Sequence, residues 1–154
     1  MAETRTISNI IGVIGAGTRV SFTLFQFGAS IGSAGTEART IGTEITLFCS
    51  VLKQLQSTFT NARSFRQSIS AIDAIHEVLD QCQEIFKDIE SIIDGLQKRK
   101  AATLEPSSQF ISRVRWTSKK SKLQLLRTRL ESCKITLHIM LTTLDFAQKI
   151  ATRR

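Results

Sequence analysis

The sequence has 154 residues, of which 42% are hydrophobic, so it is long and apolar enough for one folded domain and is not a disordered tail. It contains one proline and no tyrosine, and so few helix breakers favour long helices. The formal net charge is +8, unevenly spread: residues 1–97 hold seven Lys and Arg against ten Asp and Glu, whereas residues 98–154 hold fourteen against three.

The first predicted element is an apolar, glycine-rich helix over residues 1–36. Between Arg5 and Glu37 the only charged residue is Arg19, and seven of the eight glycines lie in the first 42 residues. A glycine in a helix interior costs about 1 kcal/mol relative to alanine. A helix that faces water should therefore not collect glycines without a reason, such as close packing against another helix.

Small residues recur in this segment at intervals of four, which places them in rows along one side of a helix. Such rows let two helix backbones approach closely, as they do between helices in lipid, and the segment exceeds the roughly 20 apolar residues that span a bilayer. We expect helix-on-helix packing at Ser8, Gly12, Ala16, Gly28 and Gly32. We expect membrane insertion through Ile10, Ile11, Gly12, Ile14, Gly15, Gly17, Phe22, Leu24, Phe25 and Phe27.

Two other interpretations of this segment compete with insertion. Arg19 at mid-membrane costs roughly 2.5–3.5 kcal/mol on insertion scales, so the helix is a poor permanent anchor, and a helix packed at the centre of a soluble bundle explains the same apolar residues. Gly15 and Gly17 also match the first two positions of the dinucleotide-binding pattern GxGxxG. Its third position falls on Val20, and no alternation of strands and helices follows, so we predict no nucleotide site.

Three further helices are predicted over residues 37–60, 66–99 and 108–152, because apolar residues there recur in steps of three and four. The first seam is Ile41, Ile45, Phe48, Leu52, Leu55 and Phe59. The second is Ile72, Ile75, Leu79, Cys82, Phe86, Ile89, Ile93 and Leu96. The third is Leu123, Leu126, Leu130, Cys133, Leu137, Met140, Leu144 and Ala147. The sequence therefore predicts an all-α fold: a single helical bundle of four to five long helices in one domain, 1–154.

The last predicted helix begins with a basic region around the only tryptophan. A tryptophan among cations suits a membrane–water interface, and each cation near an anionic leaflet adds about 1 kcal/mol. Phosphates of nucleic acid attract the same cations, but no recognised nucleic-acid-binding motif accompanies them, so we expect no specific nucleic-acid partner. Pairing with neighbouring helices is a further use of these cations. The predicted contacts to anionic lipid are Arg113, Arg115, Trp116, Lys119, Lys120 and Lys122.

No pattern in the sequence indicates an enzyme, a cofactor or a metal site. His76 and His138 stand alone, without partners at metal-binding spacing. The three cysteines, an odd number without a CxxC pair, indicate reduced thiols in a cytosolic protein. The first residues carry one acid and one base before the apolar run, with Ala2 in place of glycine, so we expect neither a secretory signal nor N-myristoylation.

Three stretches of the chain resemble the fungal HeLo-like domains. The segment Ile7–Ala34, with its glycine and serine rows and a Phe-Gln-Phe, is similar to the N-terminus of that family, and so is the stretch EITLFCSVLKQL that begins at Glu44. The strongest likeness is FISRVRWTSKKSKL, which begins at Phe110 and leads into a Leu-Glu-x-x-Lys-x-x-Leu helix from Leu130. The resemblance covers nearly the whole chain.

The resemblance implies one of two roles. Some members of the family are cell-death executioners, similar in role to the helical bundle of the necroptosis pseudokinase: the bundle forms a homo-oligomer, releases its N-terminal segment and permeabilises the plasma membrane. Such a protein is cytoplasmic when inactive, and its partners are anionic lipids, copies of itself and an upstream NOD-like receptor. Other members are soluble interaction modules at the N-terminus of NOD-like receptors or other multidomain proteins.

Overall fold

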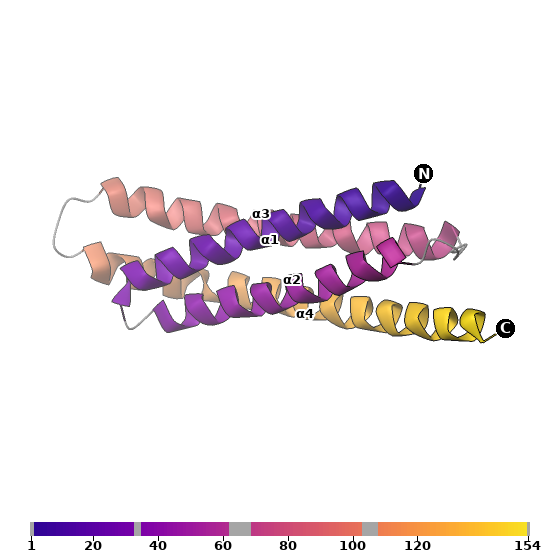
Figure 1. Cartoon of the computed structure of the whole chain (residues 1–154). Coiled ribbons are helices and arrows are strands. Elements are labelled where there is room, and N and C mark those ends of the chain that lie inside the picture. Colours follow the sequence, from indigo (N-terminus) through magenta and orange to yellow (C-terminus); the bar gives the residue numbers. More distant parts are fainter. Residues whose placement is uncertain (1, 33–34, 62–68, 103–107, 154) are drawn as a thin grey trace.

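The computed structural model describes residues 2–32, 35–61, 69–102 and 108–153, and every regular element in these ranges is helical (Figure 1). The four long helices are α1 (Ala2–Ser30), α2 (Gly35–Asn61), α3 (Ile69–Ala102) and α4 (Ser108–Thr152). The predicted all-α bundle is confirmed, with four helices and an apolar N-terminal one.

The first helix is shorter than the predicted range 1–36, whereas the other three lie within a few residues of their predicted ranges. α1 ends at Ser30, and Gly32 then adopts a left-handed backbone with φ 68°, a conformation with which glycine commonly ends a helix. Gly35 begins α2 so close to α1 that a Cβ atom there would overlap the carbonyl oxygen of Gly28. The chain therefore reverses direction inside the stretch that its apolar composition assigns to one helix.

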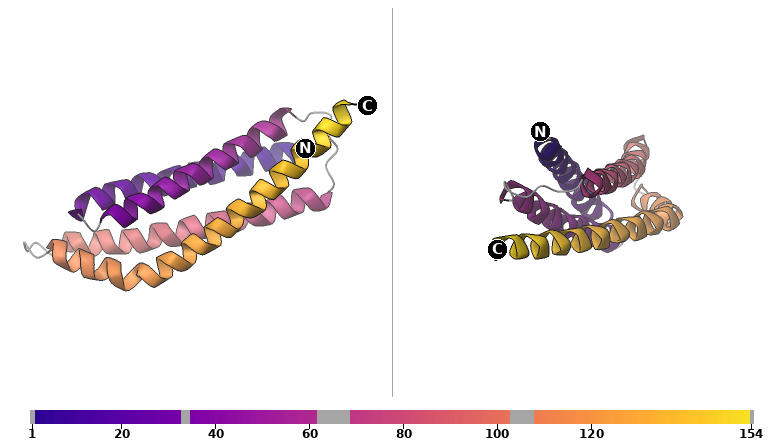
Figure 2. Two further views of the ribbon diagram at one scale, coloured as in Figure 1. Left: turned by 90° about the horizontal axis from the view of Figure 1, so that it is seen from below. Right: turned by 90° about the vertical axis from the view of Figure 1, so that its right-hand side faces the viewer.

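The helices form a ring in which sequence neighbours are not always spatial neighbours. α1 and α3 run in one direction and α2 and α4 in the other, and both chain ends lie at the same end of the bundle (Figure 1). α1 packs mainly against α2 and α3, and α4 packs mainly against the same two helices. The order around the ring is thus α1, α2, α4, α3, with α1 diagonally opposite α4 (Figure 2).

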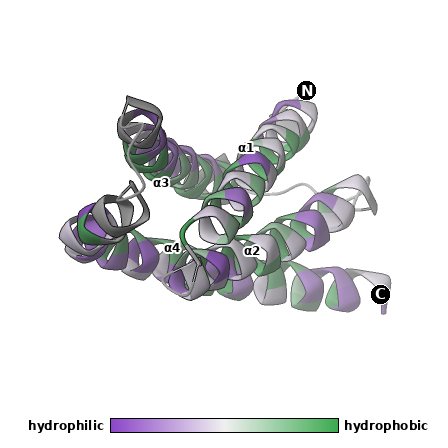
Figure 3. Ribbon diagram, turned by 90° about the vertical axis from the view of Figure 1, so that its left-hand side faces the viewer, coloured by the Kyte–Doolittle hydropathy of each residue, from purple (hydrophilic) through white to green (hydrophobic). Residues whose placement is uncertain are grey.

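The predicted seams form the core of this ring. Every seam residue of α2 is buried, as are those of α3 from Ile75 onward and six of the eight on α4. Phe48 of α2 and Phe86 of α3 meet edge to face with ring centroids 6.0 Å apart, an arrangement that aromatic pairs prefer. The end-on view in Figure 3 shows the hydrophobic sides of the helices turned toward one another.

Small residues bring α1 and α2 close together. A Cβ atom at Gly17 would lie 2.6 Å from the Cys49 sulfur of α2, and Gly28 is equally constrained at the turn. The buried Ser21 hydroxyl donates to the carbonyl oxygen of Gly42 at 2.7 Å. Part of the glycine content of the N-terminal segment is therefore explained by packing within the bundle itself.

Candidate membrane-binding surface

The face of α1 that points away from the bundle is apolar. Ile11, Phe22 and Phe25 are 51%, 62% and 38% exposed on it, and Arg19 is the only charged residue between Arg5 and the end of α1. Thr4–Ser30 is long and apolar enough to cross a membrane. Because the core helix of a soluble protein passes the same test of length and composition, the exposed apolar side chains are the more informative observation.

The residues predicted to enter a membrane fall on both sides of α1. The exposed ones are Ile11, Gly12, Gly15, Phe22 and Phe25. The ones buried in the bundle are Ile10, Gly17, Leu24 and Phe27, and Ile14 is half-buried. Insertion of the buried group into lipid requires α1 to leave α2 and α3.

The small residues predicted to pack helix on helix also divide. Gly28 is buried against α2, Ala16 is half-buried, and Ser8 and Gly12 are exposed. Gly32 lies beyond the end of α1, where it shapes the turn into α2. In the folded bundle Gly32 therefore does not pack one helix against another, because a left-handed glycine ends the helix before it. Its packing between helices in lipid stays a prediction.

Gly12 and Gly15 serve no packing purpose inside the bundle. A Cβ atom at Gly12 would lie 3.9 Å from the side-chain nitrogen of Gln83, an ordinary van der Waals contact, and a Cβ atom at Gly15 would meet nothing within 4 Å. Each glycine nevertheless costs the helix about 1 kcal/mol relative to alanine. Internal packing explains Gly17 and Gly28, but it leaves the two glycines of the exposed face unexplained.

Two threonines of α1 hydrogen-bond to the backbone of their own helix. The Thr18 hydroxyl donates to the carbonyl oxygen of Ile14 at 2.8 Å, and the Thr23 hydroxyl donates to that of Arg19 at 2.9 Å. A hydroxyl that already has a partner costs less to place in an apolar environment. The charge of Arg19 is therefore the main obstacle to burying this face in lipid.

Three polar side chains join the N-terminal end of α1 to α3. The Asn9 amide donates to Nδ1 of His76 at 2.8 Å, and the Thr6 hydroxyl lies 3.0 Å from Nε2 of His76. Sequence reasoning missed this contact, although Thr6 and Asn9, three residues apart, share one side of an apolar helix.

Trp116 lies in the core and not at the surface, with 3% of its area exposed. Its ring packs against Phe27 of α1 with centroids 5.5 Å apart, and its Nε1–H donates to Oε2 of Glu37 at 3.1 Å. Trp116 therefore cannot reach a membrane interface while the bundle is closed. The sequence held a signal for this burial, because Trp116 lies one heptad before Leu123 on the same seam.

The basic side chains of α4 divide between solvent and α2. Lys119, Lys120 and Lys122 are exposed and Arg115 is half-buried. Nζ of the exposed Lys120 also lies 3.9 Å from Oε2 of Glu37 on α2. Arg113 belongs to α4, but its side chain falls outside the described residues.

Arg127 forms the best-aligned ion pair between α4 and α2. Its Nε–H donates to Oε2 of Glu44 at 2.9 Å, and a terminal N–H donates to the other carboxylate oxygen. The hydrogen bond to Glu44 raises the pKa of Arg127 above its ordinary value. Part of the positive charge of α4 thus holds helices together, as the alternative interpretation of the cations anticipates.

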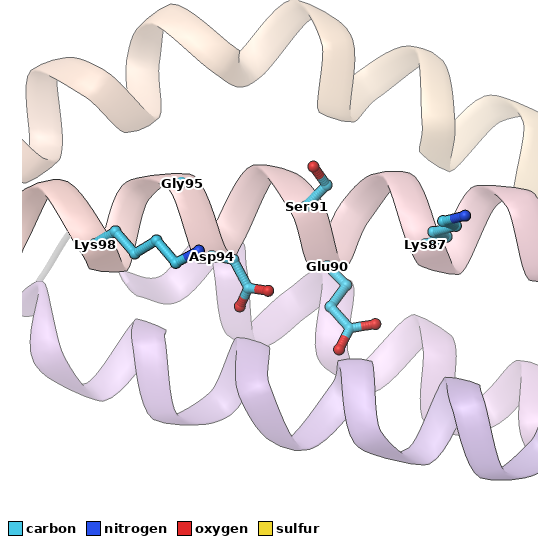
Figure 4. Close-up of a pocket in the computed structure, with 6 residues that line it drawn as sticks. All are labelled: Lys87, Glu90, Ser91, Asp94, Gly95 and Lys98. Carbon is cyan, nitrogen blue, oxygen red and sulfur yellow. The ribbon is translucent and has the colours of Figure 1, made fainter.

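The described residues contain no group of three or more His, Cys, Asp or Glu side chains that could hold a metal ion. The surface pocket in Figure 4 is lined only by residues of α3, and its charged side chains are two lysines and two acids: Lys87, Glu90, Asp94 and Lys98. Because these charges balance, the pocket favours neither an anionic nor a cationic ligand.

The three cysteines are free and buried. A side-chain hydrogen bond with Cys133, together with burial, raises the pKa of the Cys82 thiol. The same hydrogen bond, aided by Arg129 and opposed by burial, lowers the pKa of Cys133 to about 7. With 4% of Cys133 and none of Cys82 exposed, neither sulfur is placed to reach a substrate.

Comparison of the chain with protein-family profiles, with curated proteins and with solved structures finds no match. The resemblance to HeLo-like domains therefore stays a prediction, and the functional argument depends on the residues described above.

Proposed function

We propose that this chain is a membrane-targeting helical bundle that permeabilises anionic membranes when α1 leaves the bundle and inserts into the bilayer as part of a homo-oligomer. From the likeness to HeLo-like domains we take programmed cell death at the plasma membrane as the setting and a NOD-like receptor as the upstream partner. The proposal includes no catalytic step and no cofactor.

The outer face of α1 is the observation that carries this proposal. The outer face of a helix in a soluble bundle is ordinarily charged or polar. On α1 three large apolar side chains and two glycines lie exposed beside a single charged residue, Arg19. The glycines Gly12 and Gly15, which the bundle does not need, would let a second helix approach this face closely in lipid.

The inner face of α1 is suited to the same transfer. Ile10, Leu24 and Phe27 would exchange contacts with the core for contacts with lipid chains, so their apolar surface would never face water. The main opposing term is Arg19, at roughly 2.5–3.5 kcal/mol for an arginine at mid-membrane. An oligomer in which Arg19 faces a polar lumen removes this cost, and for that reason we propose an oligomer.

Exposed lysines at the start of α4 supply attraction to the membrane surface. Lys119 and Lys122 are exposed, and each cation near an anionic leaflet adds about 1 kcal/mol. Trp116 packs on Phe27 of α1, so departure of α1 would uncover the tryptophan. Release of α1 and exposure of Trp116 are therefore coupled in this proposal.

A soluble interaction module of a NOD-like receptor or other multidomain protein is the second candidate function. The pairing of Lys120 and Arg127 with acids of α2 favours it, because these cations then hold helices together instead of contacting lipid. This candidate predicts no dependence on lipid. Co-sedimentation with phosphatidylserine vesicles across salt concentrations separates the two candidates, because attraction to headgroups weakens with screening.

Dye release from phosphatidylserine vesicles tests the first proposal with a matched pair of variants. Phe22 on α1 and Leu47 on α2 are 62% and 60% exposed, so aspartate at either position leaves the core intact. We expect Phe22→Asp to abolish dye release, because a carboxylate added to the outer face between Arg5 and the end of α1 opposes insertion. We expect Leu47→Asp to release as much dye as the parent chain. Equal behaviour of the two variants contradicts a specific role for α1.

A further inference from the structure

The C-terminal half of α4 carries an apolar stripe that the bundle does not cover. Ile135, Ile139, Phe146 and Ile150 are 52%, 62%, 66% and 44% exposed, and we call these four residues the outer stripe. Their spacing of four, seven and four residues places them on the side of the helix opposite the buried seam residue Leu137.

Polar residues within the outer stripe do not interrupt it. Thr142 donates its hydroxyl to the carbonyl oxygen of His138 at 2.9 Å, and Thr143 donates to that of Ile139 at 2.8 Å. Neither hydroxyl therefore needs a partner outside the helix. At 1.5 Å per residue the outer stripe runs for about 22 Å, and a continuous apolar surface of this kind marks a contact site.

One edge of the outer stripe carries two acids, an imidazole and a base, and their order along the helix indicates that the partner is a second copy of this chain. Along the helix the order is Glu131, His138, Asp145 and Lys149, all exposed and on one side of the stripe. Read in reverse, the order is base, acid, imidazole, acid, so the edge complements itself when a second copy lies antiparallel. Glu131 also pairs with Lys134 of its own helix at 2.9 Å, and its second carboxylate oxygen can accept a further bond.

We propose that two copies of this chain associate through the outer stripe as an antiparallel, two-fold symmetric pair of α4 helices. In this register Glu131 meets the partner's Lys149 and His138 meets the partner's Asp145. Between these charges, Ile135 packs against the partner's Phe146. This dimer goes beyond the proposed membrane oligomer, which forms through α1.

A parallel pair of α4 helices fits the same residues less well. It would face the charged edge with the opposite edge of the partner's outer stripe, where Thr136 and Thr143 carry no charge. Neither Glu131 with Lys149 nor His138 with Asp145 could then pair across the interface. Charge complementarity therefore selects the antiparallel arrangement.

Sedimentation velocity over a concentration series of the full chain tests the dimer with a matched pair of variants. Ile139 and Leu125 are both 62% exposed on α4, but Leu125 lies outside the paired region. We expect Ile139→Asp to raise the dimer dissociation constant at least about tenfold and Leu125→Asp to leave it unchanged. The proposal is overturned if the chain stays monomeric at about 100 μM, or if the two variants behave alike.

Charge reversal tests the register. Glu131→Lys and Lys149→Glu should each weaken the dimer, and the double variant should regain the parent's dissociation constant, because the reversed pair forms across the interface. No recovery in the double variant overturns the antiparallel register. If the chain is monomeric and Ile139→Asp loses vesicle binding, the outer stripe contacts lipid and the dimer is overturned. Failure of the membrane proposal is a different result, namely that Phe22→Asp and Leu47→Asp release equal amounts of dye.

Discussion

α1 and α4 lie diagonally opposite in the bundle, and both turn large apolar side chains toward solvent, but different residues surround those side chains. On α4 acids and a base border the outer stripe along one edge, whereas on α1 the exposed apolar residues stand among glycines beside one arginine. Charged edges keep a surface soluble and select a partner by charge. Exposed apolar area alone therefore does not separate a protein-binding surface from a membrane-inserting one, and the surrounding charges do.

The largest expected change in the free energy of unfolding comes from removing the buried contact between Trp116 of α4 and Phe27 of α1. Trp116→Ala should lower the free energy of unfolding by about 3–5 kcal/mol, because it empties a buried site against Phe27. Phe22→Ala, at an exposed site of α1, should change it by about 0.5 kcal/mol or less. Urea unfolding measures both. A small loss for Trp116→Ala would mean that the tryptophan faces solvent and that α4 differs less from α1 than we describe.

The next largest change in stability should distinguish the inner glycines of α1, Gly17 and Gly28, from the outer ones, Gly12 and Gly15. Gly17→Leu should destabilise the bundle by about 1–3 kcal/mol, because even a Cβ atom there would lie 2.6 Å from the Cys49 sulfur. Gly15→Leu should not destabilise it, since nothing lies within 4 Å of its Cβ position. Thermal unfolding of the two variants checks this contrast, and equal destabilisation would contradict the division of the glycines.

The outer glycines should show opposite effects on stability and on membrane activity. Gly12→Ala with Gly15→Ala should stabilise the bundle by about 1 kcal/mol for each glycine removed from the helix. The same double variant should release less dye from vesicles, because two added methyl groups keep inserted helices apart. Unfolding curves and dye release on one protein sample measure both quantities. Unchanged release would show that these glycines have no role in lipid.

The smallest expected effect concerns the charges that hold α4 to α2. Glu44→Gln should lower the free energy of unfolding by about 1 kcal/mol or less, because the pair with Arg127 is partly exposed. The loss should shrink in high salt, which screens the parent pair. Urea unfolding at two salt concentrations checks it. A loss comparable to that of Trp116→Ala would mean that the basic region of α4 is mainly structural.

The fold could be predicted because three seams repeat without a break, and the step of three and four fixes both the helices and their buried sides. The first helix boundary could not be predicted from this pattern. Gly32 and Gly35 end one helix and begin the next inside an apolar stretch, and hydrophobic composition does not report the sign of φ at a glycine.

The candidate site could be predicted only in part, because long-range partners decide which residues are exposed. Composition identifies α1 as unusual, but the ring arrangement determines that Phe22 faces solvent and Phe27 faces Trp116. His76 looked isolated because its partners, Thr6 and Asn9, lie about seventy residues away in the chain. Extending the seam of α4 by one heptad would have placed Trp116 in the core.

A disulfide that locks α1 to α2 tests release of α1 most directly. The hydroxyl oxygens of Ser21 and Thr46 lie 2.8 Å apart, close enough for cysteines at these positions to form a disulfide. The variant Ser21→Cys with Thr46→Cys should release no dye from phosphatidylserine vesicles when oxidised and should release dye again after reduction, while reductant leaves the parent chain unaffected. Equal release from the oxidised and reduced forms would contradict the claim that α1 leaves the bundle.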